Sequence, residues 1–223
     1  MISLLFDIDG TLLRAGNAGM KAVHESLVEM FGEVEEAKML VHGRTDHGIM
    51  TDVFAGIGQD YQKHRNEFDQ LYWSKLPEVM ATSGGELLPG VLQLLEALSA
   101  EPDMALGILT GNARAAADIK LKFFGIEQYF SFGGYGDHDS DRNQVAALAV
   151  AEARSSLKDS FDSDQVWVIG DTVNDIRCGR SVGAKVIAVE TGGGTRKELL
   201  EAEPDIVFKD LANKDAFLTT VRK

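Results

Sequence analysis

Short apolar runs recur along the chain, and each ends at a polar or glycine-containing turn. Continuous runs of Ile, Leu and Val are typical of parallel strands that are buried on both faces. Four runs have this form: 2–8, 104–109, 166–169 and 185–189. A weaker strand is predicted at 129–133, and an edge strand at 205–208.

Segments with helical spacing separate these runs. They cover 89–99, 112–124, 142–157 and 173–181. Pro89 suits a first helical turn, Asn112 is a capping type, and Gly125 suits a helix end. The alternation predicts an α/β fold, a doubly wound parallel sheet with a Rossmann-like core and helices on both faces.

One long segment breaks the alternation. Between Gly16 and Gly85 the pattern predicts helices at 18–31, 46–55 and 61–81 and no strong strand. Because this segment is too long for a single crossover, we expect a small helical cap domain, 16–85, inserted after the first strand. The core domain would comprise 1–15 and 86–223, with hinges at 14–19 and 82–85. The alternative is helices packed flat on the sheet.

The composition limits the kinds of partner that the protein is expected to bind. The 223 residues carry a net charge of −13, which opposes binding to nucleic acid or to anionic membranes. Cys178 is the only cysteine, so no intramolecular disulfide can form. The apolar N-terminus lacks the basic region of a signal peptide, and no apolar stretch is long enough to span a membrane. We expect a cytoplasmic protein; the sequence does not indicate its oligomeric state.

Acidic side chains follow two of the predicted strands. Asp7 and Asp9 come at the end of the first, and Asp171 and Asp175 follow the 166–169 strand. Because the carboxyl ends of parallel strands share one edge of the sheet, these four carboxylates should meet there. Their mutual repulsion calls for a hard cation, and an oxygen-only ligand set suits Mg²⁺ rather than zinc.

Anion-binding groups follow the 104–109 strand. The Thr110 hydroxyl and the amides of Gly111 and Asn112 lie at a predicted helix N-terminus, and Arg142 is the candidate cation that completes charge neutralisation. Each pattern alone has an ordinary explanation, a helix cap or a turn. An EF-hand is excluded, because Thr11, Leu12 and Ala18 occupy its ligand and glycine positions.

Together these patterns resemble the haloacid dehalogenase superfamily. The four motifs of this superfamily have similar counterparts here in the same order: residues 7–12 (DIDGTL), Thr110, Arg142 and 170–175 (GDTVND). Segments 184–189 (AKVIAV), 191–193 (TGG) and 204–208 (PDIVF) are similar to the phosphoglycolate-phosphatase-like subgroup. Two departures are Arg142, where Lys is commoner, and Asn143, where proline usually follows.

The resemblance implies a magnesium-dependent phosphatase acting on a small phosphorylated metabolite, phosphoglycolate-like or a sugar phosphate. Asp7 would become an aspartyl-phosphate, and Asp9 would protonate the leaving oxygen and later activate water. Mg²⁺ would bind the Asp7 carboxylate, the Asp9 carbonyl and Asp171, with Asp175 nearby or bound through water. The phosphoryl oxygens would be held by Thr110, Gly111, Asn112 and Arg142.

Three alternatives remain at this point. A phosphomutase of the β-phosphoglucomutase type has a His twelve residues after the nucleophile, where this chain has Gly19, and His24 is out of register. A non-catalytic phospholigand-binding module would be expected to have lost the nucleophile or a metal acid. A dehalogenase would lack the acid at Asp9.

Substrate specificity is predicted to come from the insertion. The polar loop 41–46 carries Arg44, which could meet a substrate carboxylate or a second phosphate, with help from His42 and His47. An ordinary helix-capping turn with Asp46 as the cap is an equal alternative. Tyr72 and Trp73 are expected in the core of the insertion.

Overall fold

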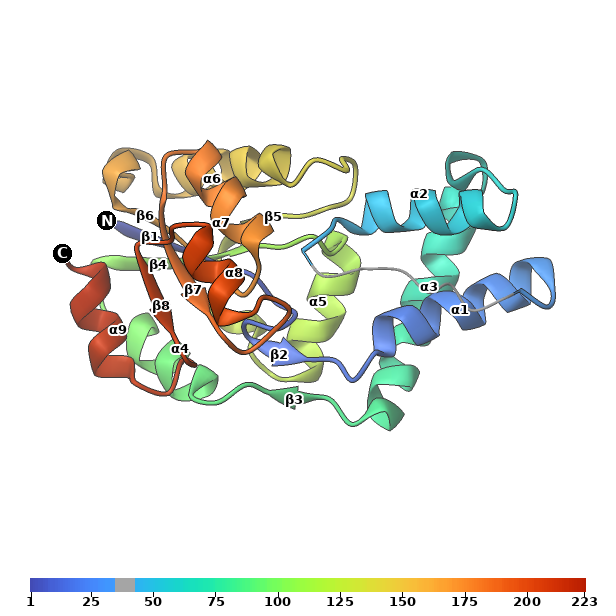
Figure 1. Ribbon diagram of the computed structural model, residues 1–223, viewed down its shortest axis with the longest axis horizontal. Helices are drawn as coiled ribbons and strands as arrows, with labels where there is room; N and C mark the ends of the chain where they lie inside the picture. The colour runs from blue at the N-terminus through green and yellow to red at the C-terminus, as the bar shows by residue number, and fades with distance from the viewer. Residues whose placement is uncertain (35–42) are drawn as a thin grey trace.

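A six-stranded parallel sheet forms the centre of the molecule. The computed structural model describes residues 1–34 and 43–223. The strand order is β5-β4-β1-β6-β7-β8 (Figure 1). The strands are β1 (Ile2–Phe6), β4 (Met104–Leu109), β5 (Phe132–Gly134), β6 (Val166–Gly170), β7 (Lys185–Val189) and β8 (Ile206–Phe208). Phe6 of β1 pairs with Ile108 on one side and Ile169 on the other, so three strands end together.

Helices cover both faces of this sheet, as the alternation predicted. One face packs on α4 (Val91–Ser99), α5 (Arg114–Phe123) and α9 (Lys214–Val221), and the other on α6 (Arg142–Leu157), α7 (Val173–Ser181) and α8 (Arg196–Glu201). Successive side chains of β1 serve opposite faces: Leu4 and Phe6 join the first cluster, and Leu5 joins the second. All three side chains are fully buried.

The insertion contains three helices: α1 (Ala18–Phe31), α2 (Asp46–Gly56) and α3 (Tyr61–Ser83). They share a hydrophobic cluster of their own, built around Phe54, Phe68 and Leu76. Ala116 of α5 belongs to the same cluster, which joins the insertion to the sheet-bearing part. In Figure 1 these helices lie at the end of the molecule away from both termini, so they are not packed flat on the sheet.

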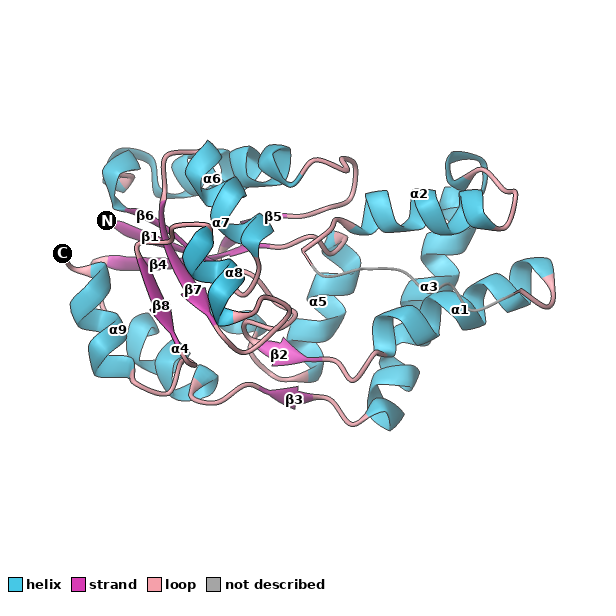
Figure 2. Ribbon diagram, in the orientation of Figure 1, coloured by secondary structure: helices cyan, strands magenta, loops and turns pink. Residues whose placement is uncertain are grey.

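The chain enters and leaves the insertion through a two-stranded antiparallel ribbon. Its strands are β2 (Leu13–Arg14) and β3 (Glu86–Leu87), drawn in magenta between the main sheet and the insertion in Figure 2. The ribbon lies next to the predicted hinges, and Gly16 packs its Cα so tightly on Ser83 that a Cβ would lie 2.1 Å from the Ser83 carbonyl oxygen. The two chain crossings are therefore adjacent and closely packed.

Some predicted boundaries were wrong. The helix expected from Asn112 begins at Arg114, because Asn112 uses its side chain to bind Lys120 instead of capping. The strand expected at 129–133 is a 3₁₀ turn, Glu127–Tyr129, followed by β5. The helices α8 and α9 and both ribbon strands were not predicted. Two further 3₁₀ turns cover Lys158–Ser160 and Ser163–Gln165.

Within the described part of the chain, no helix has both the length and the apolar character required to cross a bilayer.

Candidate active site

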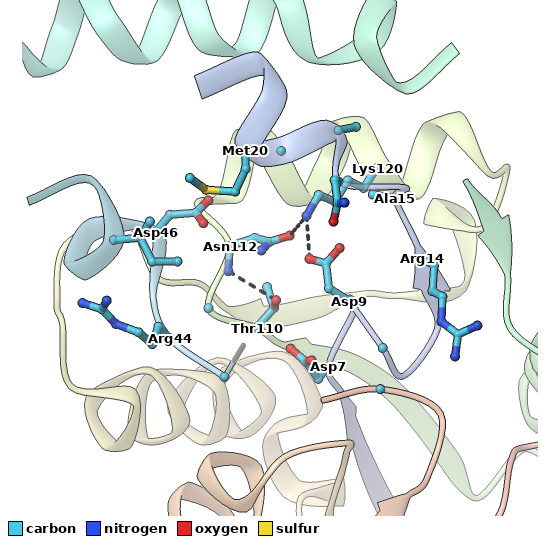
Figure 3. A pocket seen from close by; sticks show the side chains of 18 of the residues that line it. Asp7, Asp9, Arg14, Ala15, Met20, Arg44, Asp46, Thr110, Asn112 and Lys120 are labelled. Carbon is cyan, nitrogen blue, oxygen red and sulfur yellow. Dashed lines mark hydrogen bonds and ion pairs between the residues drawn. The ribbon is translucent and has the colours of Figure 1, made fainter. Parts of the chain in front are cut away.

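A cavity of about 460 Å³ lies between the carboxyl ends of the strands and the insertion. Asp7, Thr110 and Asp171 line it from the sheet, and Met20, Ile49 and Met50 line it from α1 and α2. Figure 3 shows the side chains of Asp7 and Thr110 on one side of this space and that of Met20 on the other. The volume lies in the range of small-molecule sites, and a crevice at the strand ends is where ligands bind to open parallel sheets.

Three of the predicted carboxylates form one buried cluster. Asp7, Asp171 and Asp175 each offer an oxygen, and these atoms all lie within 4.8 Å of one another. The residues are 6%, 1% and 0% exposed. Residues separated by more than 160 positions in the sequence thus meet at the edge of the sheet, as the strand-end pattern predicted.

Two glycines allow the loops to approach this cluster. At Gly10 the φ angle is +88°, and a Cβ would lie 2.5 Å from Asp171 Oδ2. At Gly192 a Cβ would lie 1.9 Å from the same oxygen. The backbone can therefore reach the carboxylate directly, and the Gly193 amide donates to Asp171 Oδ2 at 2.6 Å.

Arg142 holds two members of the cluster. Its guanidinium donates to Asp7 Oδ1 at 2.9 Å and also contacts Asp175 Oδ1. The Asp175 Oδ2 atom accepts from the Thr172 amide at 2.9 Å and from its hydroxyl at 2.6 Å, which completes the N-terminal capping box of α7. Arg142 is therefore a buried cation in direct contact with two carboxylates of the cluster.

Two carboxyl groups of the cluster, those of Asp7 and Asp171, are hard to ionise. The pKa of Asp7 is raised to about 7, mainly by burial; the charges of Asp175 and Asp9 add to the rise, and Arg142 opposes it. Burial and the charges of Asp175 and Asp7 also raise the pKa of Asp171 well above its usual value. A divalent cation relieves both effects, so this all-oxygen donor set fits Mg²⁺. Asp175, with both oxygens already bonded, is less free to bind a metal than Asp7 or Asp171.

The turn after β4 packs against the start of α2. Thr110 is 1% exposed, and its Oγ1 accepts from the Asn112 amide at 3.3 Å. The Gly111 carbonyl accepts from the Asp46 amide at 2.6 Å, and a Cβ on Gly111 would lie 1.9 Å from the Arg44 carbonyl oxygen. The predicted phosphate-binding turn therefore touches the insertion directly.

Asp9 stands apart from the buried cluster. Its side chain is 39% exposed, and its Oδ2 accepts from Lys120 Nζ at 2.5 Å. The sequence analysis did not identify Lys120, although its spacing was a signal. Lys120 shares a helical face with Ala113, Ala116 and Ala117, which are buried. A lysine on the buried stripe of a helix is unusual unless its charge has a partner.

The predicted specificity residues are placed differently from one another. Arg44 lines the cavity, but its guanidinium points away from Asp7 (Figure 3) and donates to Asp52 Oδ2 at 2.5 Å. The His47 ring packs on Tyr61, and His42 lies outside the described residues. A substrate contact by Arg44 stays a prediction.

Asp46 has a role other than the one considered from sequence. Thr45, rather than Asp46, caps α2, because its hydroxyl accepts from the Gly48 amide. The Asp46 carboxylate instead accepts from the Ala113 amide just before α5, at 2.8 Å. Burial raises the pKa of Asp46 to about 6, while Lys120 opposes this rise.

Comparisons with known proteins agree with this arrangement. The sequence model of a family described as haloacid dehalogenase-like hydrolase matches residues 4–189. The chain is similar to phosphoglycolate phosphatases of Synechococcus elongatus (29% identity over 120 residues, covering 54% of this chain and 53% of the relative) and Haemophilus influenzae (30% over 131 residues, 56% and 54%). The matches span about half the length of these two relatives.

The fold is similar to that of a solved structure described as CbbY from Rhodobacter sphaeroides in complex with phosphate. The TM-score is 0.72 with 18% identity, and the match covers 96% of each chain. At this identity the likeness concerns the fold.

Proposed function

Since the chain belongs to the haloacid dehalogenase-like hydrolase family, we propose that it is a Mg²⁺-dependent phosphatase that moves the phosphoryl group of a small metabolite onto Asp7 and then onto water. One observation carries the proposal: Asp7 lines the cavity, is bonded to Arg142, and shares a 4.8 Å cluster with Asp171 and Asp175. This arrangement combines a nucleophile, a cation and metal ligands at one point.

The chemistry assigned to these residues has two steps. In the first, an Asp7 carboxylate oxygen attacks phosphorus as the bond to the ester oxygen breaks, and Asp9 gives that oxygen a proton. In the second, Asp9 takes a proton from water as the water attacks the aspartyl-phosphate, which releases phosphate. Arg142 and the turn of Thr110, Gly111 and Asn112 hold the phosphoryl oxygens.

The proposed metal ligands are the Asp7 carboxylate, the Asp9 carbonyl oxygen and Asp171, with Asp175 close by. Bound Mg²⁺ supplies positive charge between the carboxylates and the anionic phosphoryl group. Burial and neighbouring negative charges raise the pKa values of Asp7 and Asp171, and this supports the proposal that a cation binds between them.

Helices α1–α3 act in this proposal as a cap, comprising residues 16–85, that closes the cavity and excludes water. Met20, Ile49 and Met50 line its side of the cavity, so the cap offers apolar contacts next to Arg44 and Asp46. The substrate is proposed to be a phosphoglycolate-like acid or a sugar phosphate. The negative charge of the chain favours a small substrate over nucleic acid, and a cytoplasmic location is proposed with it.

A phosphomutase is the alternative that the fold also allows. It requires a side chain in the cap that transfers protons to and from the sugar. Gly19, which lines the cavity at the relevant position, has no side chain to do this. The hydrolase is therefore the better-supported assignment.

The test is phosphate release from p-nitrophenyl phosphate by the purified protein, with Mg²⁺ and with EDTA. We expect turnover that requires Mg²⁺ and falls at least about 10³-fold in Asp7→Asn, because the amide cannot act as the nucleophile. The matched control is Asp164→Asn, the same change at an exposed site, which should retain the full rate. Near-normal turnover by folded Asp7→Asn would refute the assignment, and a panel of phosphorylated metabolites then identifies the substrate.

A further inference from the structure

Lys120 is a buried cation that the mechanism above does not use. The residue is only 5% exposed, although it is a lysine that lines the cavity. It belongs to the buried side of α5, together with Ala117 and Leu121. Such burial is costly for an ammonium group unless the charge is paired.

The ammonium group is paired at two points. It donates to Asp9 Oδ2 at 2.5 Å and to Asn112 Oδ1 at 2.8 Å, as the dashed lines in Figure 3 show. The Asn112 amide in turn donates to Thr110 Oγ1. Lys120 therefore joins the candidate acid after β1 to the candidate phosphate-binding turn after β4.

Asp9 needs such a partner more than the other carboxylates do. The side chains of Asp7 and Asp175 are buried and bonded to Arg142, whereas that of Asp9 is 39% exposed at the cavity wall. A side chain of this exposure can adopt several rotamers in solvent. A buried ammonium group that makes two hydrogen bonds selects one of these rotamers.

On this basis, and resting on the proposed phosphatase function, we propose that Lys120 is a positioning residue for phosphoryl transfer: its ammonium group holds the Asp9 carboxyl group beside the leaving-group oxygen. The two buried cations thus divide their work. Arg142 holds the nucleophile, and Lys120 holds the acid. Lys120 itself touches neither phosphorus nor the leaving group.

The first test compares Lys120→Met with Lys122→Met. Methionine preserves most of the buried stem and removes the charge, and Lys122 is an exposed lysine on the same helix. Each variant is assayed with p-nitrophenyl phosphate, whose leaving group needs little protonation, and with phosphoglycolate, whose alkyl leaving group needs a proton. For Lys120→Met we expect kcat/KM on phosphoglycolate, which reports phosphoryl transfer to Asp7, to fall about 100-fold, and kcat/KM on p-nitrophenyl phosphate to fall less than about 5-fold. The value of kcat is not used for this comparison, because it also contains the water step that the two substrates share. Lys122→Met should match the unmodified protein.

A double-mutant cycle separates positioning from general damage. If Lys120 acts through Asp9, adding Lys120→Met to Asp9→Asn should lower kcat/KM on phosphoglycolate by less than about 2-fold further, against about 100-fold when Asp9 is intact. Equal losses of kcat/KM on the two substrates, or losses that multiply in the double variant, would overturn the positioning role.

A crystal structure of the unmodified protein with Mg²⁺ and inorganic phosphate gives a test that does not depend on the folding of a variant. Lys120 Nζ within hydrogen-bonding distance of the Asp9 carboxylate supports the proposal, and an ammonium group turned onto the phosphate overturns it. Different results would contradict the phosphatase function and the positioning role of Lys120. Retained turnover in Asp7→Asn contradicts the phosphatase mechanism, whereas Asp7-dependent turnover with equal Lys120→Met losses contradicts only the role of Lys120.

Discussion

Arg142 is the residue on which the buried carboxylates depend most. Its planar group contacts Asp7 and Asp175 at once, and the side chains of both acids are buried. Removing one partner of a buried ion pair leaves an unpaired buried charge. The resulting loss of stability is larger than the net stabilisation that the intact pair contributes.

We therefore expect Arg142→Met to lower the free energy of unfolding by roughly 3 kcal/mol in metal-free protein near neutral pH, measured by urea denaturation. Turnover should fall at least about 100-fold, and Arg142→Lys should recover part of the rate, because the charge returns without the planar fork. The control is Arg154→Met on the exposed face of the same helix, which should cost less than about 1 kcal/mol. Equal stability losses in the two methionine variants would contradict this role of Arg142.

Asp46 predicts a pH dependence with a definite sign. Its pKa rises on folding to about 6, so the folded state favours the protonated form relative to the unfolded chain. The associated stability is present below about pH 4 and is lost as pH rises through about 6. Asp46→Asn should therefore flatten the fall in unfolding free energy between pH 4.5 and 7, measured by urea titrations at each pH. Asp52→Asn, the same change on an exposed part of α2, should leave the slope unaltered. A fall in Asp46→Asn as steep as in the unmodified protein would refute the assignment; the part that remains is due to the buried Asp7 and Asp171.

Residues at strand ends could be predicted, whereas residues that arrive from helices could not. Asp7, Thr110 and Asp171 each come directly after a buried apolar run in the sequence. The end of each run therefore placed these residues at one edge of the sheet. Lys120 and Asp46 reach the site only through the packing of α5 and α2. That packing depends on tertiary contacts that no local pattern records, such as the amide of Ala113 meeting Asp46.

At the scale of elements, the contact between the β4 turn and the start of α2 sets how close the insertion can come. Gly111 faces the Arg44 carbonyl oxygen with no room for a side chain. The two amides at the start of α2, those of Asp46 and His47, donate to the carbonyl oxygens of Gly111 and Gly136. A methyl group at Gly111 must therefore push α2 outward.

We expect Gly111→Ala to lower kcat/KM at least about 10-fold and to cost about 1–3 kcal/mol in unfolding free energy, because overpacking moves backbone on both sides. The matched change is Gly56→Ala at the end of α2, where a Cβ meets nothing within 4 Å. That variant should be neutral or slightly stabilised. Full activity in Gly111→Ala would show that α2 need not approach this turn during catalysis.

Element positions were predicted well where the apolar pattern is long. The helices at 142–157 and 173–181 and the strands at 104–109 and 185–189 have the predicted bounds. Short elements were missed, because α8 has six residues and each ribbon strand has two, too few for a period to be visible. The order of the strands, which sets β1 between β4 and β6, could not be obtained from any single segment.

At the scale of the whole molecule, the site should couple metal binding to stability. Burial raises the pKa of Asp7 to about 7, so ionising Asp7 opposes folding as pH rises from about 4 to about 7 in metal-free protein. The loss is on the order of 4 kcal/mol for a rise in pKa from 3.8 to about 7. Mg²⁺ binds the ionised form, so its stabilising effect should grow over the same range.

The measurement is the thermal midpoint in EDTA and in Mg²⁺ at pH 6 and at pH 8. We expect the increase caused by Mg²⁺ to be several degrees larger at pH 8. Asp7→Asn should raise the midpoint in EDTA at pH 8 and reduce the response to Mg²⁺, since it removes the charge that folding opposes. An identical Mg²⁺ response at both pH values would argue against Asp7 as a ligand.

The paired strands β2 and β3 have an evolutionary consequence. Neighbouring strands lie about 4.8 Å apart, so the whole excursion from one to the other begins and ends at nearly the same point of the scaffold. A replacement module of another length or architecture needs only two ends at that spacing to be grafted there. Substrate range could thus diversify by exchange of this module, while the reactive carboxylates stay untouched on their own strands.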